Sequence, residues 1–144
     1  MFDANLVLLD GTVDYDPSND TAPTSIQRDG ATGAVVIDIG TGGTPASGLS
    51  CVLILPAAND GTDILTAVLE VSSAVGFGSD KSVVGDFDLA AANPGIILGS
   101  ETPCVIILRF TTDKRYVRLN GTVTASDDFK RAKCFLTPYG FTIL

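Results

Sequence analysis

The chain has 144 residues, 45 % of them hydrophobic and 18 % charged, and a net charge of -8. This is the length of one domain, so we expect residues 1–144 to share a single core. The acidic balance argues against nucleic-acid binding, which needs clustered Lys and Arg, and no apolar run approaches the roughly 20 residues of a membrane span. Typical soluble domains carry about 25 % charged residues, so some apolar surface is expected to be covered by a partner.

Charge is distributed unevenly along the chain. Up to Leu108 there are two basic residues and fourteen acidic ones, whereas seven basic residues and three acidic ones follow from Arg109 onward. The densest basic group is Lys130, Arg131 and Lys133. The basic final third could meet an acidic protein surface, or it could be a solvated edge that is partly neutralised within the molecule.

Eight extended segments, separated by spacers rich in Gly, Pro, Asn and Asp, can be read along the chain. In chain order they are Asn5 to Leu9, Ala34 to Ile39, Ser50 to Leu55, Ile64 to Ser73, Ser82 to Leu89, Cys104 to Thr111, Tyr116 to Thr124, and Ala132 to Leu144. A helix is an alternative only for Ile64 to Val71, where β-branched residues favour a strand. The pattern predicts an all-β fold, a jelly-roll β-sandwich of about eight antiparallel strands.

The clearest alternation lies in KRYVRLNGTVTA, from Lys114 to Ala125. A period of two places Val117, Leu119, Gly121 and Val123 on one face, and polar residues such as Arg118 on the other. This pattern is typical of a strand with one buried face.

Several other segments are apolar on both faces, among them CVLIL (Cys51 to Leu55) and CVIIL (Cys104 to Leu108). A sandwich strand with one wet face should alternate, so a second covered face is expected. If Cys104, Ile106, Leu108 and Phe110 face the core, then Val105, Ile107 and Arg109 point outward together. An apolar patch that contains one Arg is typical of an interface, and we expect a homo-oligomer.

Catalytic chemistry has little support, because there is no histidine to serve as a general base. Asp86 and Asp88 could form a glycosidase pair, but a polar strand face opposite Val83, Gly85, Phe87 and Leu89 is the simpler interpretation. We therefore predict a protein that is not an enzyme, with no catalytic residue and no cofactor.

Metal and disulfide sites also have weak support. The Asp14 to Asp20 loop is rich in oxygen ligands, yet Pro17 interrupts it and no EF-hand glutamate follows, so no metal site is assigned. Three cysteines, Cys51, Cys104 and Cys134, lie in or beside apolar runs and are predicted to be buried free thiols.

Three motifs, ANLVLLDGTV, TAVLEVSS and KRYVRLNGTV, together resemble the capsid cement (decoration) proteins of tailed bacteriophages of the Bordetella-phage type. The most specific part is Arg115 to Asn120, and the order of segments is similar from Asn5 to Leu144. The Asp- and Pro-rich loop from Asp10 to Gly33 is longer than in that pattern.

The resemblance implies a jelly roll without enzyme activity or cofactor, made in the bacterial cytoplasm and bound to the outside of an icosahedral capsid. Its partners would be the major capsid protein and itself, as a homodimer in preference to a homotrimer. It transfers no functional residue, so the candidate interface Val105, Ile107, Arg109, Lys130, Arg131 and Lys133 comes from the residue pattern. The alternative function is a carbohydrate-binding jelly roll, for which Tyr15, Tyr116 and Tyr139 are the aromatic candidates.

Overall fold

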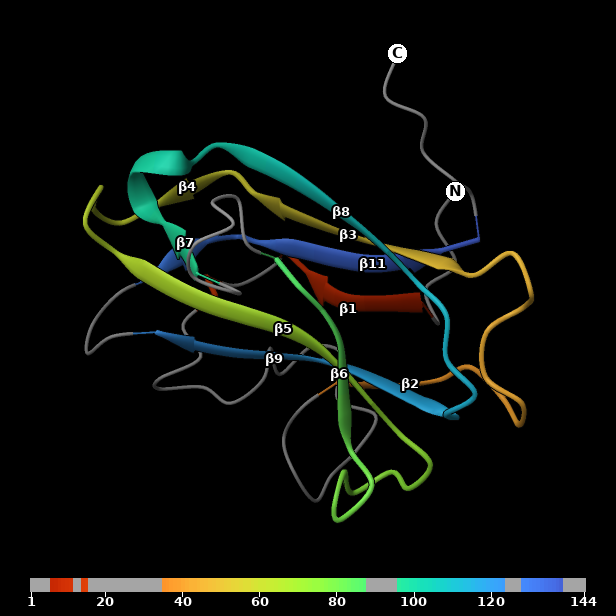
Figure 1. Ribbon diagram of the computed structural model, residues 1–144. Helices are drawn as coiled ribbons and strands as arrows, with labels where there is room; N and C mark the ends of the chain where they lie inside the picture. Colours follow the sequence, from red (N-terminus) through yellow and green to blue (C-terminus); the bar gives the residue numbers. More distant parts are fainter. Residues whose placement is uncertain (1–5, 12–13, 16–34, 88–95, 124–127, 139–144) are drawn as a thin grey trace.

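The computed structural model describes residues 6–11, 14–15, 35–87, 96–123 and 128–138. These ranges form strands and one short 3-10 helix, η3, at Gly99–Glu101 (Figure 1). The strands are β1 Val7–Asp10, β2 Val36–Asp38, β3 Leu49–Leu55, β4 Ala57–Ala58, β5 Ile64–Ser72, β6 Ser82–Asp86, β7 Ile96–Leu98, β8 Cys104–Phe110, β9 Tyr116–Val123, β10 Phe129–Lys130 and β11 Lys133–Thr137. Each of the eight predicted segments overlaps a strand, and β5 is confirmed as a strand; residues 139–144 of the last segment lie outside the described residues.

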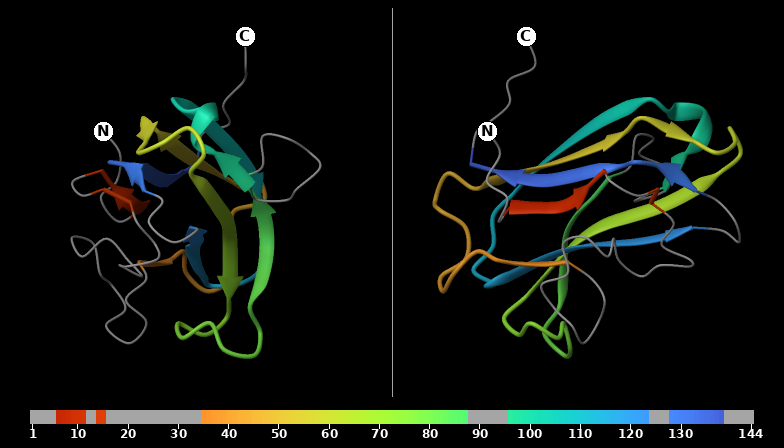
Figure 2. Two further views of the ribbon diagram at one scale, coloured as in Figure 1. Left: turned by 90° about the vertical axis from the view of Figure 1, so that its left-hand side faces the viewer. Right: turned by 180° about the vertical axis from the view of Figure 1, so that it is seen from behind.

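Two antiparallel sheets form the body of the molecule. One has the order β1-β11-β3-β8 and the other has the order β2-β9-β5-β6, with β7 also paired to β5. If β4, β7 and β10 are set aside and the other eight strands are counted in chain order, the first pairs with the last, the second with the seventh, the third with the sixth and the fourth with the fifth. This is the pairing of one long antiparallel ribbon rolled into two sheets, so the predicted jelly roll is confirmed (Figures 1 and 2).

The core fills the space between the two sheets. Both contribute fully buried side chains, such as Leu53 of β3 and Leu65, Leu69 and Val117 of β5 and β9. Burial of each such side chain stabilises the fold by about 1.5–3 kcal/mol relative to an exposed position. The alternation predicted for KRYVRLNGTVTA is confirmed, because Val117, Leu119 and Val123 contribute to the core.

The prediction of which β6 side chains face the core is wrong at one residue. Gly85 and Phe87 face the core as expected, but Val83 is 56 % exposed and lies opposite Glu70 on the outer face. The register shifts between Leu69 and Glu70, and Val84 packs against the core instead. A β-bulge adds one residue to a strand and so reverses its inside–outside pattern beyond that point.

Two of the three cysteines are deeply buried. The Sγ atoms of Cys51 and Cys134 lie 3.5 Å apart, and all three cysteines are free. Burial raises the pKa of the Cys51 thiol well above its usual value, which keeps it protonated and unreactive. Buried free thiols are thus confirmed for Cys51 and Cys134, while Cys104 is half-buried.

Candidate interface

The outer face of the β1-β11-β3-β8 sheet is built by three neighbouring strands whose register is known. Residues directly opposite one another in an antiparallel pair project from the same face. Val52 lies opposite Ile107 on one side and Phe135 on the other, and Ile54 lies between Val105 and Lys133 in the same way. We call this surface the apolar outer face; its members are Ser50, Val52 and Ile54 of β3, Val105, Ile107 and Arg109 of β8, and Lys133, Phe135 and Thr137 of β11.

Exposure increases across this face toward β8. Val52 and Phe135 are 3 % and 8 % exposed, whereas Ile107 is 38 % and Val105 59 % exposed. Neither Val52 nor Phe135 belongs to the cluster that fills the core. The predicted alternation of β8 is confirmed, because Ile106, Leu108 and Phe110 contact the core while Val105, Ile107 and Arg109 point outward. The β8 edge of the sheet therefore presents apolar side chains to its surroundings.

Val52, Ile54 and Phe135 were not among the candidate interface residues taken from the sequence. The signal that could have found them is the CVLIL run itself. Its alternate members Val52 and Ile54 are the second apolar face that this run was expected to have.

Most positive charge of the final third is neutralised within the molecule. Arg115 pairs with Asp38 at 2.7 Å, Lys114 with Asp80 at 3.2 Å, and Lys130 with both Asp14 and Asp128. Lys81 and Arg118 both pair with Glu70. Over the described ranges, the basic side chains without an ion pair are Arg109, Arg131 and Lys133. The self-neutralising alternative thus holds for the greater part of the basic segment.

The six predicted interface residues do not form one surface. Val105, Ile107, Arg109 and Lys133 share the apolar outer face. Lys130 belongs instead to the short β4–β10 ribbon and is committed to two ion pairs. Arg131 occupies the turn between β10 and β11, where its backbone has a φ of 36°. Lys130, Arg131 and Lys133 are close in sequence but do not form a single basic surface in the fold.

The outer face of the other sheet carries an internally satisfied polar network beside the exposed apolar side chains of Val83 and Leu98. Glu70 of β5 accepts hydrogen bonds from Arg118 at 2.8 Å and from Asn120 at 3.1 Å, and its side chain is 6 % exposed. The Arg118 guanidinium lies 4.3 Å from the centre of the Phe77 ring. Burial would raise the pKa of Glu70, but the hydrogen bonds and charges of Arg118, Asn120 and Lys81 outweigh it and hold that pKa below its usual value. These groups are paired with one another, so they stabilise the sheet and are not available to bind a ligand.

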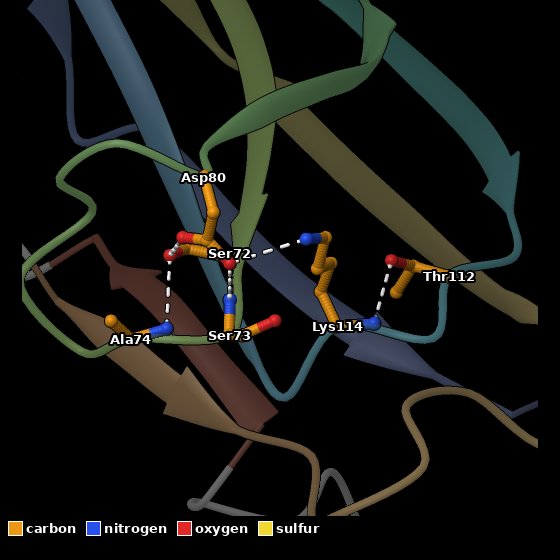
Figure 3. A network of polar contacts seen from close by, with 6 residues as sticks. All are labelled: Ser72, Ser73, Ala74, Asp80, Thr112 and Lys114. Carbon is orange, nitrogen blue, oxygen red and sulfur yellow. Dashed lines mark hydrogen bonds and ion pairs between the residues drawn. The ribbon is translucent and has the colours of Figure 1, made fainter.

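A second polar network joins the loop after β5 to the segment before β9 (Figure 3). The Asp80 carboxylate accepts from the Ser72 hydroxyl at 2.5 Å, from the Ser73 amide at 2.8 Å and from Lys114 at 3.2 Å. These hydrogen bonds, the Ser72 hydroxyl foremost, lower the pKa of Asp80. The network fixes one end of the sandwich and has no unpaired reactive group.

The candidates for other functions are scattered or buried. Asp86 is exposed at the end of β6, and Asp88 lies outside the described residues, as does most of the Asp14 to Asp20 loop. Tyr15 is 8 % exposed, Tyr116 lies under the Arg115 guanidinium at 5.2 Å, and Tyr139 is outside the described residues. In the described part of the chain, no cluster of three or more His, Cys, Asp or Glu side chains could hold a metal ion.

Comparison with known proteins finds no relative of this chain. No family model, no curated protein and no solved structure matches the chain. Within the described ranges, no helix has the length and apolar character needed to cross a membrane.

Proposed function

We propose that this protein is a structural decoration protein that binds the outer surface of an icosahedral phage capsid and links neighbouring capsomers. The observation that carries the proposal is the difference between the two sheets. The outer face of the β2-β9-β5-β6 sheet combines the exposed Val83 and Leu98 with the ion pairs of Glu70. The other sheet presents Val105 and Ile107, which are 59 % and 38 % exposed and do not pack in the core, beside Arg109 and Lys133, which have no ion pair among the described residues. Exposed apolar side chains of this kind mark protein contact surfaces.

The motifs ANLVLLDGTV, TAVLEVSS and KRYVRLNGTV support the proposal through their resemblance to phage cement proteins. In the fold they correspond to β1, β5 and β9. They supply strands to both sheets, so the resemblance concerns the body of the jelly roll rather than one loop. The homodimer expected from the sequence stays a prediction.

The fold supports the proposed mechanical role. A sandwich with paired strands and a packed core deforms little, so a subunit that touches two capsomers resists their separation. Contacts that are weak individually add up when many copies occupy a lattice. Such a protein needs no catalytic group, only a stable body and a complementary surface.

The test uses the phage whose genome carries this gene. We expect the protein in purified virions by mass spectrometry, and jelly-roll density on the outside of the capsid by cryo-electron microscopy. Particles lacking the gene should release their DNA at a lower temperature, and addition of purified protein should restore the wild-type value. Virions that contain none of the protein would overturn the proposal.

A further inference from the structure

We infer that the apolar outer face binds a surface of another protein that has an apolar centre and carboxylates at its edge, and that it does not bind a second copy of this chain. The inference rests on the proposed function, because the surface in question is that of the capsid. It adds which side of the jelly roll docks and what chemistry the capsid must present.

Charge selects the partner. The chain has a net charge of -8, yet two of the three described basic side chains without an ion pair, Arg109 and Lys133, lie on this face. Arg131 lies two residues before Lys133, in the turn between β10 and β11. Asp10 of β1 is opposite Lys133 and is the carboxylate that the described strands of this sheet place on its outer surface. The remaining excess of positive charge would be repelled by the same excess on a second copy and attracted by carboxylates.

Arg109 is held in place to make such a contact. It is the outward residue of β8 two positions after Ile107, and its guanidinium donates to the Ser47 carbonyl at 3.2 Å. That bond uses one of five N–H donors and neutralises no charge. A partner carboxylate can therefore bind beside an apolar patch, an arrangement typical of an interface with a polar rim.

The size of the exposed part argues against a stable dimer. Ser50, Val52, Phe135 and Thr137 are at most 8 % exposed, so the exposed part is smaller than the roughly 250 Å² that three strands spaced about 4.8 Å apart and five residues at about 3.3 Å each would cover. Stable complexes bury about 800 Å² on each partner. A contact this small is adequate where many copies bind a repeating surface, and it is too small to hold two free molecules together.

The experiment measures how much protein sediments with undecorated heads of the phage that carries the gene, at 50 mM and 500 mM NaCl. We expect Val105→Glu to reduce binding at least tenfold, because it places a charge at the apolar centre. The matched control is Val83→Glu, which changes an equally exposed Val on the other sheet and should bind like the wild type.

Charge is tested with the double variant Arg109→Gln and Lys133→Gln, against Lys81→Gln on the other sheet. We expect the double variant to bind several-fold less at 50 mM and to lose most of the salt dependence, since exposed charges at a rim act mainly through long-range attraction. Lys81→Gln should bind as the wild type does. Circular dichroism melts of each variant establish that it is folded.

Each outcome decides the matter. Wild-type protein that fails to sediment with heads overturns the proposed function, and this inference with it. Wild-type binding that Val105→Glu and the double variant leave intact overturns the inference alone. A wild-type dimer by light scattering that Val105→Glu dissociates, but Val83→Glu does not, would assign the face to a second copy and also overturn it.

Discussion

At the scale of single residues, Glu70 shows how a buried charge is accommodated on a strand face. Its carboxylate has Arg118, Asn120 and Lys81 around it, with the Arg118 side chain 15 % exposed. A buried ion pair does not stabilise a protein by itself, because removing both charges from water is costly. Once Arg118 is in place, however, loss of the Glu70 carboxylate leaves a half-buried cation and a half-buried amide without their charged acceptor.

We therefore predict that Glu70→Gln lowers the free energy of unfolding by about 1–3 kcal/mol at pH 7. The folded-state pKa of Glu70 is lowered, so this contribution is present above the unfolded value of about 4.3 and is lost as pH falls through the folded pKa. Urea denaturation at several pH values should show the two proteins converging below about pH 4. A constant difference from pH 7 to pH 3 would contradict this account.

Asp86→Asn is the matched control for that experiment. Asp86 is an exposed carboxylate on the neighbouring strand β6, and the same net charge is removed. Its replacement should change the free energy of unfolding by less than about 0.5 kcal/mol.

At the scale of elements, the loop before β3 is held against the β8–β9 connection by close backbone contact. Gly40, Gly42 and Gly43 have φ values of 91°, 100° and 75°, a region that residues with a Cβ rarely adopt. A Cβ on Gly43 would come within 2.0 Å of the Thr112 carbonyl oxygen, while a Cβ on Gly42 would meet nothing within 4 Å. The adjacent amide of Thr44 donates to that same carbonyl at 2.8 Å.

We predict that Gly43→Ala destabilises the protein by about 2–4 kcal/mol, the sum of backbone strain and displacement of the loop. Gly42→Ala carries the strain without the clash, and about 1–2 kcal/mol is expected. Thermal and urea denaturation of the two variants measures the difference. Equal losses would mean that the Thr112 contact moves away without cost.

The same scale shows what the sequence could predict. Periodicity and apolar runs located the eight strands other than β4, β7 and β10, because half-buried strands place every second side chain in the core. The strands β4 and β10 have two residues each and are too short to show a period. The three-residue β2 lies within the longer apolar segment Ala34 to Ile39, whereas the equally short β7 is bounded by glycines on both sides. The β6 bulge could not be predicted from the sequence either, since one extra residue reverses the inside–outside pattern without any change in composition.

The candidate interface was predictable only in part. Val105, Ile107 and Arg109 follow from one strand read alone, and the structure places them as expected. Neighbours from β3 and β11 depend on which strands pair, and this depends on contacts far apart in sequence. The ion pairs that neutralise Lys114, Arg115 and Arg118 join residues 34 to 77 positions apart. The sequence alone therefore could not show that most basic residues of the final third are already paired.

At the scale of the whole molecule, the two outer faces differ in chemistry and should differ in what binding does to them. If the apolar outer face docks on a capsid, the edge strand β8 exchanges contact with water for contact with protein, whereas β5 and β9 keep their own network of Glu70, Arg118 and Asn120.

We predict that hydrogen–deuterium exchange slows in residues 104–110 when the protein is bound to heads. Exchange in residues 64–72 and 116–123 should not change, because those amides lie in the interior of the other sheet. Val105→Glu protein, mixed with heads at the same concentration, should show no slowing. Protection confined to residues 116–123 would place the contact on the opposite side of the jelly roll and assign the exposed edge of β8 to the solvent.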